Sequence, residues 1–230
     1  MNGKRKVYAI LSLAVIAVLF AALVMTPTAY AYDGRTGNRV VIAKDEVIND
    51  DLYLGGDEVI VEGTINGDLM AAGERVVISG KVTGDLWVAG NEVIVNGEIG
   101  DDVFAAAAVV RLESNARVAD DMFSAAAGVE SSAGSQVGGS LMIGAFQGLV
   151  AGNVGEDLRA GANRLRLEGQ IGRDAQIYVD TASKDMSDYQ PWRYNSNMPS
   201  MVEIPSGLTF GSQAKVLGRL EYTSSLAISI

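Results

Sequence analysis

One short phrase recurs along most of this chain and restricts its fold more than any other feature. The phrase is an aliphatic residue, two mostly small or polar residues, an acidic residue or serine, and a second apolar residue. Its eight copies begin at Ile48, Ile65, Val82, Ile99, Val118, Val137, Val154 and Ile171. The step between copies is seventeen residues, apart from two longer steps in the middle. A regular step of this length indicates a repeat architecture.

A second phrase lies between the copies of the first. It is a short run of Val, Ile or Leu at alternate positions, followed by a polar residue and a glycine. It is clearest at residues 59–63, 76–80, 93–97 and 165–169. Runs of this kind, bounded by Gly, Asn and Asp, are typical of short strands joined by tight turns. After residue 32, no stretch has the spacing of an amphipathic helix.

A unit of seventeen residues is too short to bury its own apolar side, so successive units must stack. Each coil then pairs with the next at about 4.8 Å, and residues in phase form ladders. The expected inward ladders include Leu69 with Leu86 and Val76 with Val93. The sequence therefore predicts an all-β fold, a parallel β-helix (β-solenoid) with coils of about 17 residues.

The chain is expected to divide into four parts. These are a signal peptide or signal anchor (1–31), the β-solenoid (32–180), an inserted, proline-containing loop or cap (181–210), and one or more terminal coils (211–230). In the inserted segment, Trp192 and Tyr194 are candidates to cover an open end of the solenoid, where strand edges would otherwise be unpaired.

The first residues have the properties of an export signal. Three basic residues precede an uncharged apolar run, 7–25, and Ala29 and Ala31 fit the small-residue rule for signal-peptidase cleavage. The run is also just long enough to span a bilayer, so cleavage and retention as an anchor are both open. In either case we expect the body of the protein to be exported, and to be extracytoplasmic or membrane-anchored facing outward.

The composition argues against several classes of function. The chain has neither cysteine nor histidine, which removes disulfides, thiolate and imidazole metal sites, and mechanisms that need an imidazole. The net charge is −10, and an acidic surface repels nucleic acid. There is no phosphate-cradling loop. We expect no enzyme activity, no catalytic residue, no metal or cofactor, and no nucleotide or nucleic-acid partner.

The residue that follows each in-phase Leu, Val or Met points outward by strand alternation. In six successive coils this residue is apolar: Tyr53, Met70, Trp87, Phe104, Phe123 and Met142. We call these six residues the apolar stripe. Stacked aromatic side chains on a solenoid can simply stabilise neighbouring coils. A contiguous exposed apolar patch also marks association with a partner, so the stripe is the candidate interaction surface.

An aspartate recurs in the first phrase, at Asp51, Asp68, Asp85, Asp102 and Asp121. Carboxylates stacked about 4.8 Å apart have nearly the spacing of a glycosidase pair. A turn explains them better, because a carboxylate there accepts backbone N–H groups and because an active site would be confined to one or two coils. Binding of a divalent cation is a lesser alternative.

The repeats resemble those of the bactofilins, a bacterial family of polymer-forming cytoskeletal proteins. The resemblance rests on phrases such as INGDL at 65–69 and VTGDL at 82–86, and it covers about residues 40–180. It implies a right-handed β-helix, a protein that is not an enzyme, and copies that polymerise end to end without nucleotide. Typical bactofilins are cytoplasmic, whereas this chain has an expected export signal, so a cytoskeletal role does not carry over.

These features together predict an exported, non-enzymatic structural scaffold, similar to the bactofilins, that assembles through solenoid ends and the apolar stripe. One alternative is a membrane-anchored solenoid, attached through residues 7–25, that binds or senses an envelope polymer or protein. A β-helical polysaccharide-degrading enzyme is the third interpretation, but such enzymes usually have longer coils and long loops that build a cleft. The expected partners are further copies of the chain or envelope components.

Overall fold

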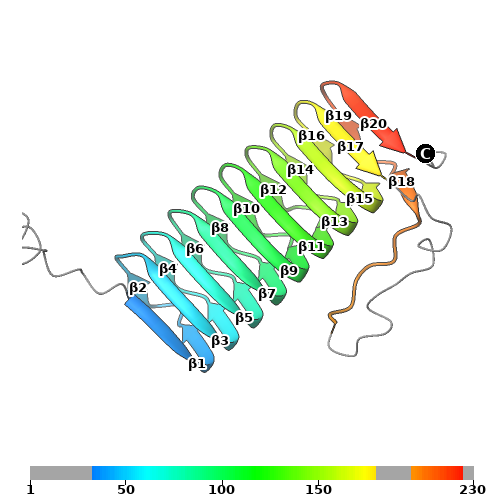
Figure 1. Cartoon of the computed structure of the whole chain (residues 1–230). Helices are drawn as coiled ribbons and strands as arrows, with labels where there is room; N and C mark the ends of the chain where they lie inside the picture. The colour runs from blue at the N-terminus through cyan, green and yellow to red at the C-terminus, as the bar shows by residue number, and fades with distance from the viewer. Residues whose placement is uncertain (1–32, 180–197, 225–230) are drawn as a thin grey trace, which may run out of the picture. The chain divides into compact units, whose positions relative to one another are not determined.

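The computed structural model describes residues 33–179 and 198–224. These residues belong to one compact unit and form a parallel β-solenoid of about nine turns, in which the coils are stacked side by side (Figure 1). Within these two ranges there is no helix, and hence none that is long and apolar enough to cross a membrane. The predicted signal segment, 1–31, lies outside the described residues.

Each coil contains one long strand and one short strand. The ten-residue strands are β1 (Asp33–Ile42), β3 (Leu52–Val61), β5 (Leu69–Ile78), β7 (Leu86–Val95), β9 (Val103–Leu112), β11 (Met122–Ser131), β13 (Leu141–Val150) and β15 (Leu158–Leu167). The two-residue strands are β2 (Val47–Ile48), β4 (Thr64–Ile65), β6 (Lys81–Val82), β8 (Glu98–Ile99), β10 (Arg117–Val118), β12 (Gln136–Val137), β14 (Asn153–Val154), β16 (Gln170–Ile171) and β19 (Lys215–Val216). The long strands form one parallel sheet and the short strands a second, each in chain order.

The inserted segment interrupts the coil that follows β15. β17 (Ala175–Val179) pairs with the first half of β15, and β18 (Gly207–Phe210) pairs with its second half. Together they occupy the place of one long strand. β20 (Leu220–Ser224) then pairs with β17 and is the last strand described. The insertion therefore separates two halves of one strand without shifting the register of the sheet.

The long strands bend in the middle. In the first half of β7 the buried residues are Leu86 and Val88, at the first and third positions. In the second half they are Val93 and Val95, at the eighth and tenth. Because side chains alternate between the two faces of a strand, this change from odd to even positions requires a bend, and the pairing register skips Asn91 at that place. Each long strand thus forms two sides of the coil, and the short strand closes the third.

The core is a set of ladders that runs through all coils. The prediction is confirmed for the ladders tested: Leu69 pairs with Leu86 and Val76 with Val93. The largest side chains that are fully buried are Ile42, Leu52, Ile65, Leu69, Ile78, Leu86, Ile99, Leu112, Met122, Leu141, Leu158 and Leu165. Each such burial contributes about 1.5–3 kcal/mol. Since no coil encloses these side chains by itself, the stability of the fold depends on contact between coils.

Candidate functional site

The apolar stripe occupies the second position of six consecutive long strands, from β3 to β13. Strand pairing places each member directly beside the next, in the order Tyr53, Met70, Trp87, Phe104, Phe123, Met142. Tyr53, Met70 and Trp87 are 38%, 48% and 44% exposed, and the other three are half-buried. The structure brings all six together on the outer side of one sheet. In the following coils the same position holds Arg159 and Gln176, so the stripe ends there.

Three aromatic rings of the stripe stack on one another. The ring centroids of Trp87 and Phe104 lie 3.9 Å apart with an interplanar angle of 12°, and those of Phe104 and Phe123 lie 5.0 Å apart at 5°. Aromatic pairs of this kind contribute about 0.5–1.5 kcal/mol beyond their burial. The stack therefore stabilises the contacts among β7, β9 and β11. This structural role leaves the outer edges of the rings available to a partner.

A row of small residues runs beside the stripe, two positions further along each strand. We call it the small row: Gly55, Ala72, Ala89, Ala106, Ala125, Gly144 and Gly161. The two rows share the outer side because side chains alternate along a strand. Residues of both rows line an open, mainly apolar groove of about 1290 Å³. The groove extends from Met70 in β5 to Tyr222 in β20.

The groove is a feature that the sequence interpretation missed. That interpretation followed one outward position per coil, which revealed the stripe but not the surface next to it. The signal was present, because an alanine or glycine stands two residues after each stripe residue. A solenoid converts such a spacing into a continuous surface only once the register between coils is known.

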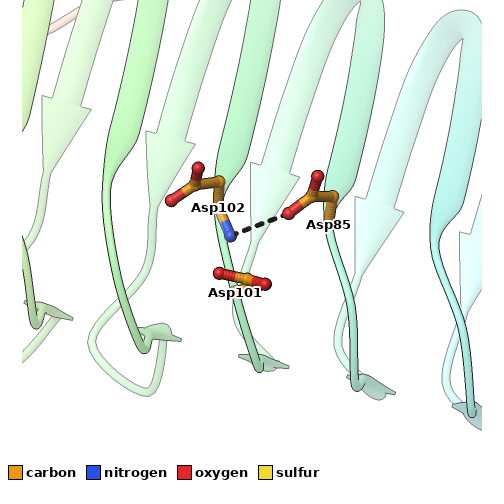
Figure 2. A group of neighbouring side chains, drawn as sticks. All are labelled: Asp85, Asp101 and Asp102. Carbon is orange, nitrogen blue, oxygen red and sulfur yellow. Dashed lines mark hydrogen bonds between the residues drawn. The ribbon is translucent and has the colours of Figure 1, made fainter.

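The recurring aspartates lie in the turn before each long strand and connect successive coils. Oδ1 of Asp68 accepts the backbone N–H of Asp85 at 2.9 Å, and Oδ1 of Asp85 accepts that of Asp102 at 3.2 Å (Figure 2). The same bond runs from Asp51 to Asp68, Asp102 to Asp121, Asp121 to Ser140, Asp157 to Asp174, and Asp174 to Arg219. The turn interpretation is confirmed, because each carboxylate binds the backbone of the next coil.

Additional acidic residues make the middle of this row crowded. Asp85, Asp101 and Asp102 have carboxylate oxygens within 4.8 Å of one another (Figure 2), and so do Asp102, Asp120 and Asp121. Partial desolvation and then the neighbouring charges, Asp121 first among them, raise the pKa of Asp120 above its ordinary value. Such clusters have the oxygen chemistry of a divalent-cation site. Asp85 and Asp102 each already use one oxygen for a backbone N–H group, so the recurring members of both clusters serve the turn.

The end of the inserted segment lies along the outside of the solenoid. We call residues 198–206 the strap; in Figure 1 it extends from β18 back along the coils. The backbone N–H of Val202 donates to Oε1 of Glu130 at 2.8 Å, and its carbonyl accepts from Nε2 of Gln147 at 2.7 Å. Arg111 donates to the carbonyl oxygen of Ser200. The strap thus joins β9, β11 and β13 from outside.

The strap explains why two polar residues on outward positions are buried. Glu130 is 8% exposed and Gln147 is 1% exposed. The charge of Glu130 is balanced by Nε of Arg111 at 3.0 Å, and Arg111 also pairs with Glu92. The sequence interpretation expected a loop or cap at 181–210 and did not foresee this contact. The predicted cap residues Trp192 and Tyr194 lie outside the described residues, so the cap stays a prediction.

Two parallel sheets, one continuous core and in-register ladders define the chain as a β-solenoid repeat protein. Comparison of the chain with protein-family models, with curated proteins and with solved structures gave no match in any of the three. The function is therefore argued from the surfaces of the solenoid, and the resemblance to the bactofilins stays a prediction.

Proposed function

We propose that the chain is an exported, non-enzymatic structural scaffold whose copies assemble with one another through a solenoid end and through the apolar stripe. The observation that carries the proposal is the stripe with its groove, an exposed apolar surface that spans six coils. Monomeric soluble proteins rarely expose contiguous apolar patches of this kind unless they use them in association. The resemblance of the repeats to the bactofilins supports the same function and, with it, a right-handed solenoid.

The N-terminal end of the described solenoid is poorly suited to stacking. In β1, Asp33 and Arg35 occupy the inward positions that Leu52 and Leu54 hold in the next coil. Nη1 of Arg35 pairs with Glu46 at 2.6 Å. A coil stacked on this end would remove charged groups from water, which is unfavourable. In other solenoids the terminal repeats have a polar outer face that keeps them soluble. The charged inward residues of β1 have the same effect at this end.

The other end is apolar at its edge. β20 is the last described strand of the long-strand sheet and β19 the last of the short-strand sheet. Leu217 is 64% exposed there, and Leu220 and Tyr222 are also exposed. Strand edges that carry exposed apolar side chains are templates for pairing with another chain. We therefore expect stacking to involve the C-terminal coils rather than β1.

The hydrogen bonds of the recurring aspartates support a non-enzymatic role. The recurring aspartates bind backbone N–H groups in coil after coil, as the hydrogen bonds above show, instead of being grouped in one cleft. The groove itself favours a second candidate, a solenoid that binds an apolar part of an envelope polymer or protein. That candidate predicts a monomer with a bound ligand, and the scaffold predicts an assembly.

Negative-stain electron microscopy with light scattering tests the proposal. The whole chain is purified without nucleotide or metal and is compared across a range of protein concentrations. Filaments, sheets or a discrete oligomer would support the scaffold. A particle that stays monomeric at every concentration would contradict it, and ligands would then be sought among envelope glycans and proteins.

A further inference from the structure

We propose that the groove receives the apolar stripe of a second copy, so that two solenoids pair side by side with their axes pointing in the same direction. The inference rests on the scaffold function proposed above and specifies the geometry of its lateral contact. In this pair each copy supplies both a stripe and a small row. The surface is therefore complementary to itself.

The stripe and the small row match in size in each of the six coils from β3 to β13. A bulky residue and a small one, two positions apart, form the pairs Tyr53 with Gly55, Met70 with Ala72, Trp87 with Ala89, Phe104 with Ala106, Phe123 with Ala125, and Met142 with Gly144. Two surfaces of this shape interlock when the stripe of each lies over the small row of the other. Small residues also allow the two backbones to approach, which increases van der Waals contact.

Only one kind of two-fold symmetry brings these rows together. A two-fold axis parallel to the coil axis reverses the strand direction across the contact. The second position of one copy then faces the fourth position of the same coil in the other, as with Phe104 and Ala106 of the second copy. A two-fold axis along the strands would instead place stripe over stripe and small row over small row. Closed dimers use the same patch on both copies, so size matching selects the parallel pair.

The size of the face predicts a weak pair. Six coils at about 4.8 Å and five residues at about 3.3 Å give a face of roughly 29 Å by 16 Å, or roughly 450 Å² per copy. Both copies together bury about 900 Å², below the roughly 1,600 Å² of a standard interface. A single pair should therefore form only at high concentration. Copies that are also joined at their ends present several faces at once, which raises the effective affinity.

Other occupants fit the surface less well. From β5 to β13 the stripe and the small row contain only Met, Trp, Phe, Ala and Gly, so the indole N–H of Trp87 is the one side-chain group in these two rows that can hydrogen-bond to a glycan. The polar lining of the groove, with Arg159, Gln176 and Glu221, lies at its C-terminal end. A net charge of −10 opposes an anionic membrane surface. An uncharged acyl chain is compatible with the chemistry of the groove but gives no reason for the matched row of large residues.

The chain has no cysteine, so pairs of single-cysteine variants can report which residues meet. A Phe104→Cys chain is mixed with an Ala106→Cys chain, both full length, and treated with a short bis-maleimide. A mixture of Met70→Cys with Phe123→Cys tests the antiparallel arrangement, in which the order of the coils is reversed about the centre of the stripe and these two positions would face each other. We expect at least about tenfold more cross-linked dimer in the first mixture, corresponding to about 1.4 kcal/mol.

Exchanging the large and the small residue within one strand distinguishes interlocking of the two rows from unspecific apolar association. Dimers are now detected through a Met70→Cys and Ala72→Cys mixture, in a coil that is not otherwise changed. Ala106→Phe fills the small row and should lower cross-linking about tenfold, although it makes the surface more apolar. The double variant Phe104→Ala, Ala106→Phe restores one large and one small residue and should recover the dimer. Unspecific apolar association instead predicts that the single variant Ala106→Phe increases cross-linking.

Each of the other possible outcomes would overturn one part of the proposal. Filaments without cross-linking between positions 104 and 106 would overturn the lateral contact and leave assembly through the ends. Preferential cross-linking between positions 70 and 123 would overturn the parallel orientation. Loss of the dimer together with stoichiometric uptake of a fluorescent fatty acid would show that a lipid, not a second copy, occupies the groove. A chain that neither cross-links nor assembles would remove the proposed function as well.

Discussion

At the scale of single residues, the glycines that end the second phrase, such as Gly97, are required by the close approach of two backbones. A Cβ on Gly97 would overlap the carbonyl oxygen of Gly80 and lie 2.8 Å from the carbonyl carbon of Ser79. Positive φ is not the reason, because among the described glycines only Gly134 and Gly207 have it. Backbone atoms cannot move aside as the tip of a side chain can.

Gly97→Ala is therefore expected to destabilise the solenoid by about 2–3 kcal/mol. Gly144→Ala is the matched control, since a Cβ there meets nothing within 4 Å and should change stability by less than about 0.5 kcal/mol. Urea unfolding followed by circular dichroism measures both. Equal losses in the two variants would show that backbone contact at the corner is not what selects glycine.

Asp120 provides a pH-dependent test of the acidic row. Its pKa is raised by partial desolvation and then by the charges of Asp121, Asp102 and Asp101. A raised folded-state pKa means that ionised Asp120 destabilises the fold. This penalty is fully present above the folded-state pKa and disappears as the pH falls below the unfolded value of about 3.9. Asp120→Asn should raise the unfolding midpoint at neutral pH and change it little below about pH 3.

Asp174→Asn is the control of opposite sign. The pKa of Asp174 is lowered by the backbone N–H of Arg219, at 2.8 Å, and by the guanidinium charge of the same residue. Its ionised form therefore contributes stability above the unfolded value of about 3.9, which is lost as the pH falls through the folded-state pKa. This variant should lower the midpoint at neutral pH and converge with the unmodified chain in acid. Two variants that shift in the same direction would contradict the assignment.

At the scale of elements, the strap is held in part by hydrogen bonds between its backbone and side chains of the sheet. Glu130→Ala removes the acceptor for the N–H of Val202 and the partner of Arg111, and should loosen the strap by about 1–3 kcal/mol. Hydrogen exchange at the amide of Val202 measures this directly. Glu98→Ala is the control, because the pair of Glu98 with Lys81 is exposed and contributes about 0–1 kcal/mol.

A second variant tests the packing of the strap without changing charge. Met201 packs against Gly128, where an added Cβ would overlap Sδ of the methionine. Since a methionine side chain can move aside, Gly128→Val should speed exchange at Val202 only as far as the packing of Met201 holds the strap in place. If Glu130→Ala and Gly128→Val both left that amide protected, the strap would be held by contacts other than those described here.

At the scale of the whole molecule, the stripe should control assembly and not folding. Trp87→Glu combined with Phe104→Glu places charges in the centre of the stripe and should at least halve the assembled fraction in light scattering. The loss of the ring stack lowers stability by about 1 kcal/mol, so folding is checked by circular dichroism. Val47→Glu is the matched control, since Val47 is an exposed apolar residue on the short-strand side. Equal effects of both changes would remove the stripe from the assembly surface.

Salt dependence distinguishes apolar from ionic contact between copies. With a net charge of −10, copies repel each other, and screening reduces this repulsion once the Debye length falls to about 10 Å, near 0.1 M salt. Assembly through the apolar stripe should therefore increase as NaCl is raised from about 0.02 M to about 0.2 M. Dissociation over the same range would indicate that ion pairs hold the copies together.

Local sequence patterns were enough to predict the structure of one coil. Period-two alternation and a step of seventeen residues are local properties, and they were enough to predict the parallel stack, the inward ladders and the outward direction of Trp87 and its neighbours. The turn aspartates were predictable for the same reason, because they recur with the repeat. Each carboxylate accepts a backbone N–H group one repeat away. The first half of β1 was the exception, since Asp33 and Arg35 take inward positions without matching the apolar pattern.

The contacts on the outside of the coils could not be predicted from such patterns. The strap reaches Arg111 from Ser200, a separation of 89 residues, and no local pattern encodes a contact between an irregular segment and a distant strand. The groove likewise needed the register of successive strands, because its depth is set by which large and small residues stand side by side. Alternation decides whether a residue points inward or outward, whereas contacts between distant segments decide which outward residues stay exposed.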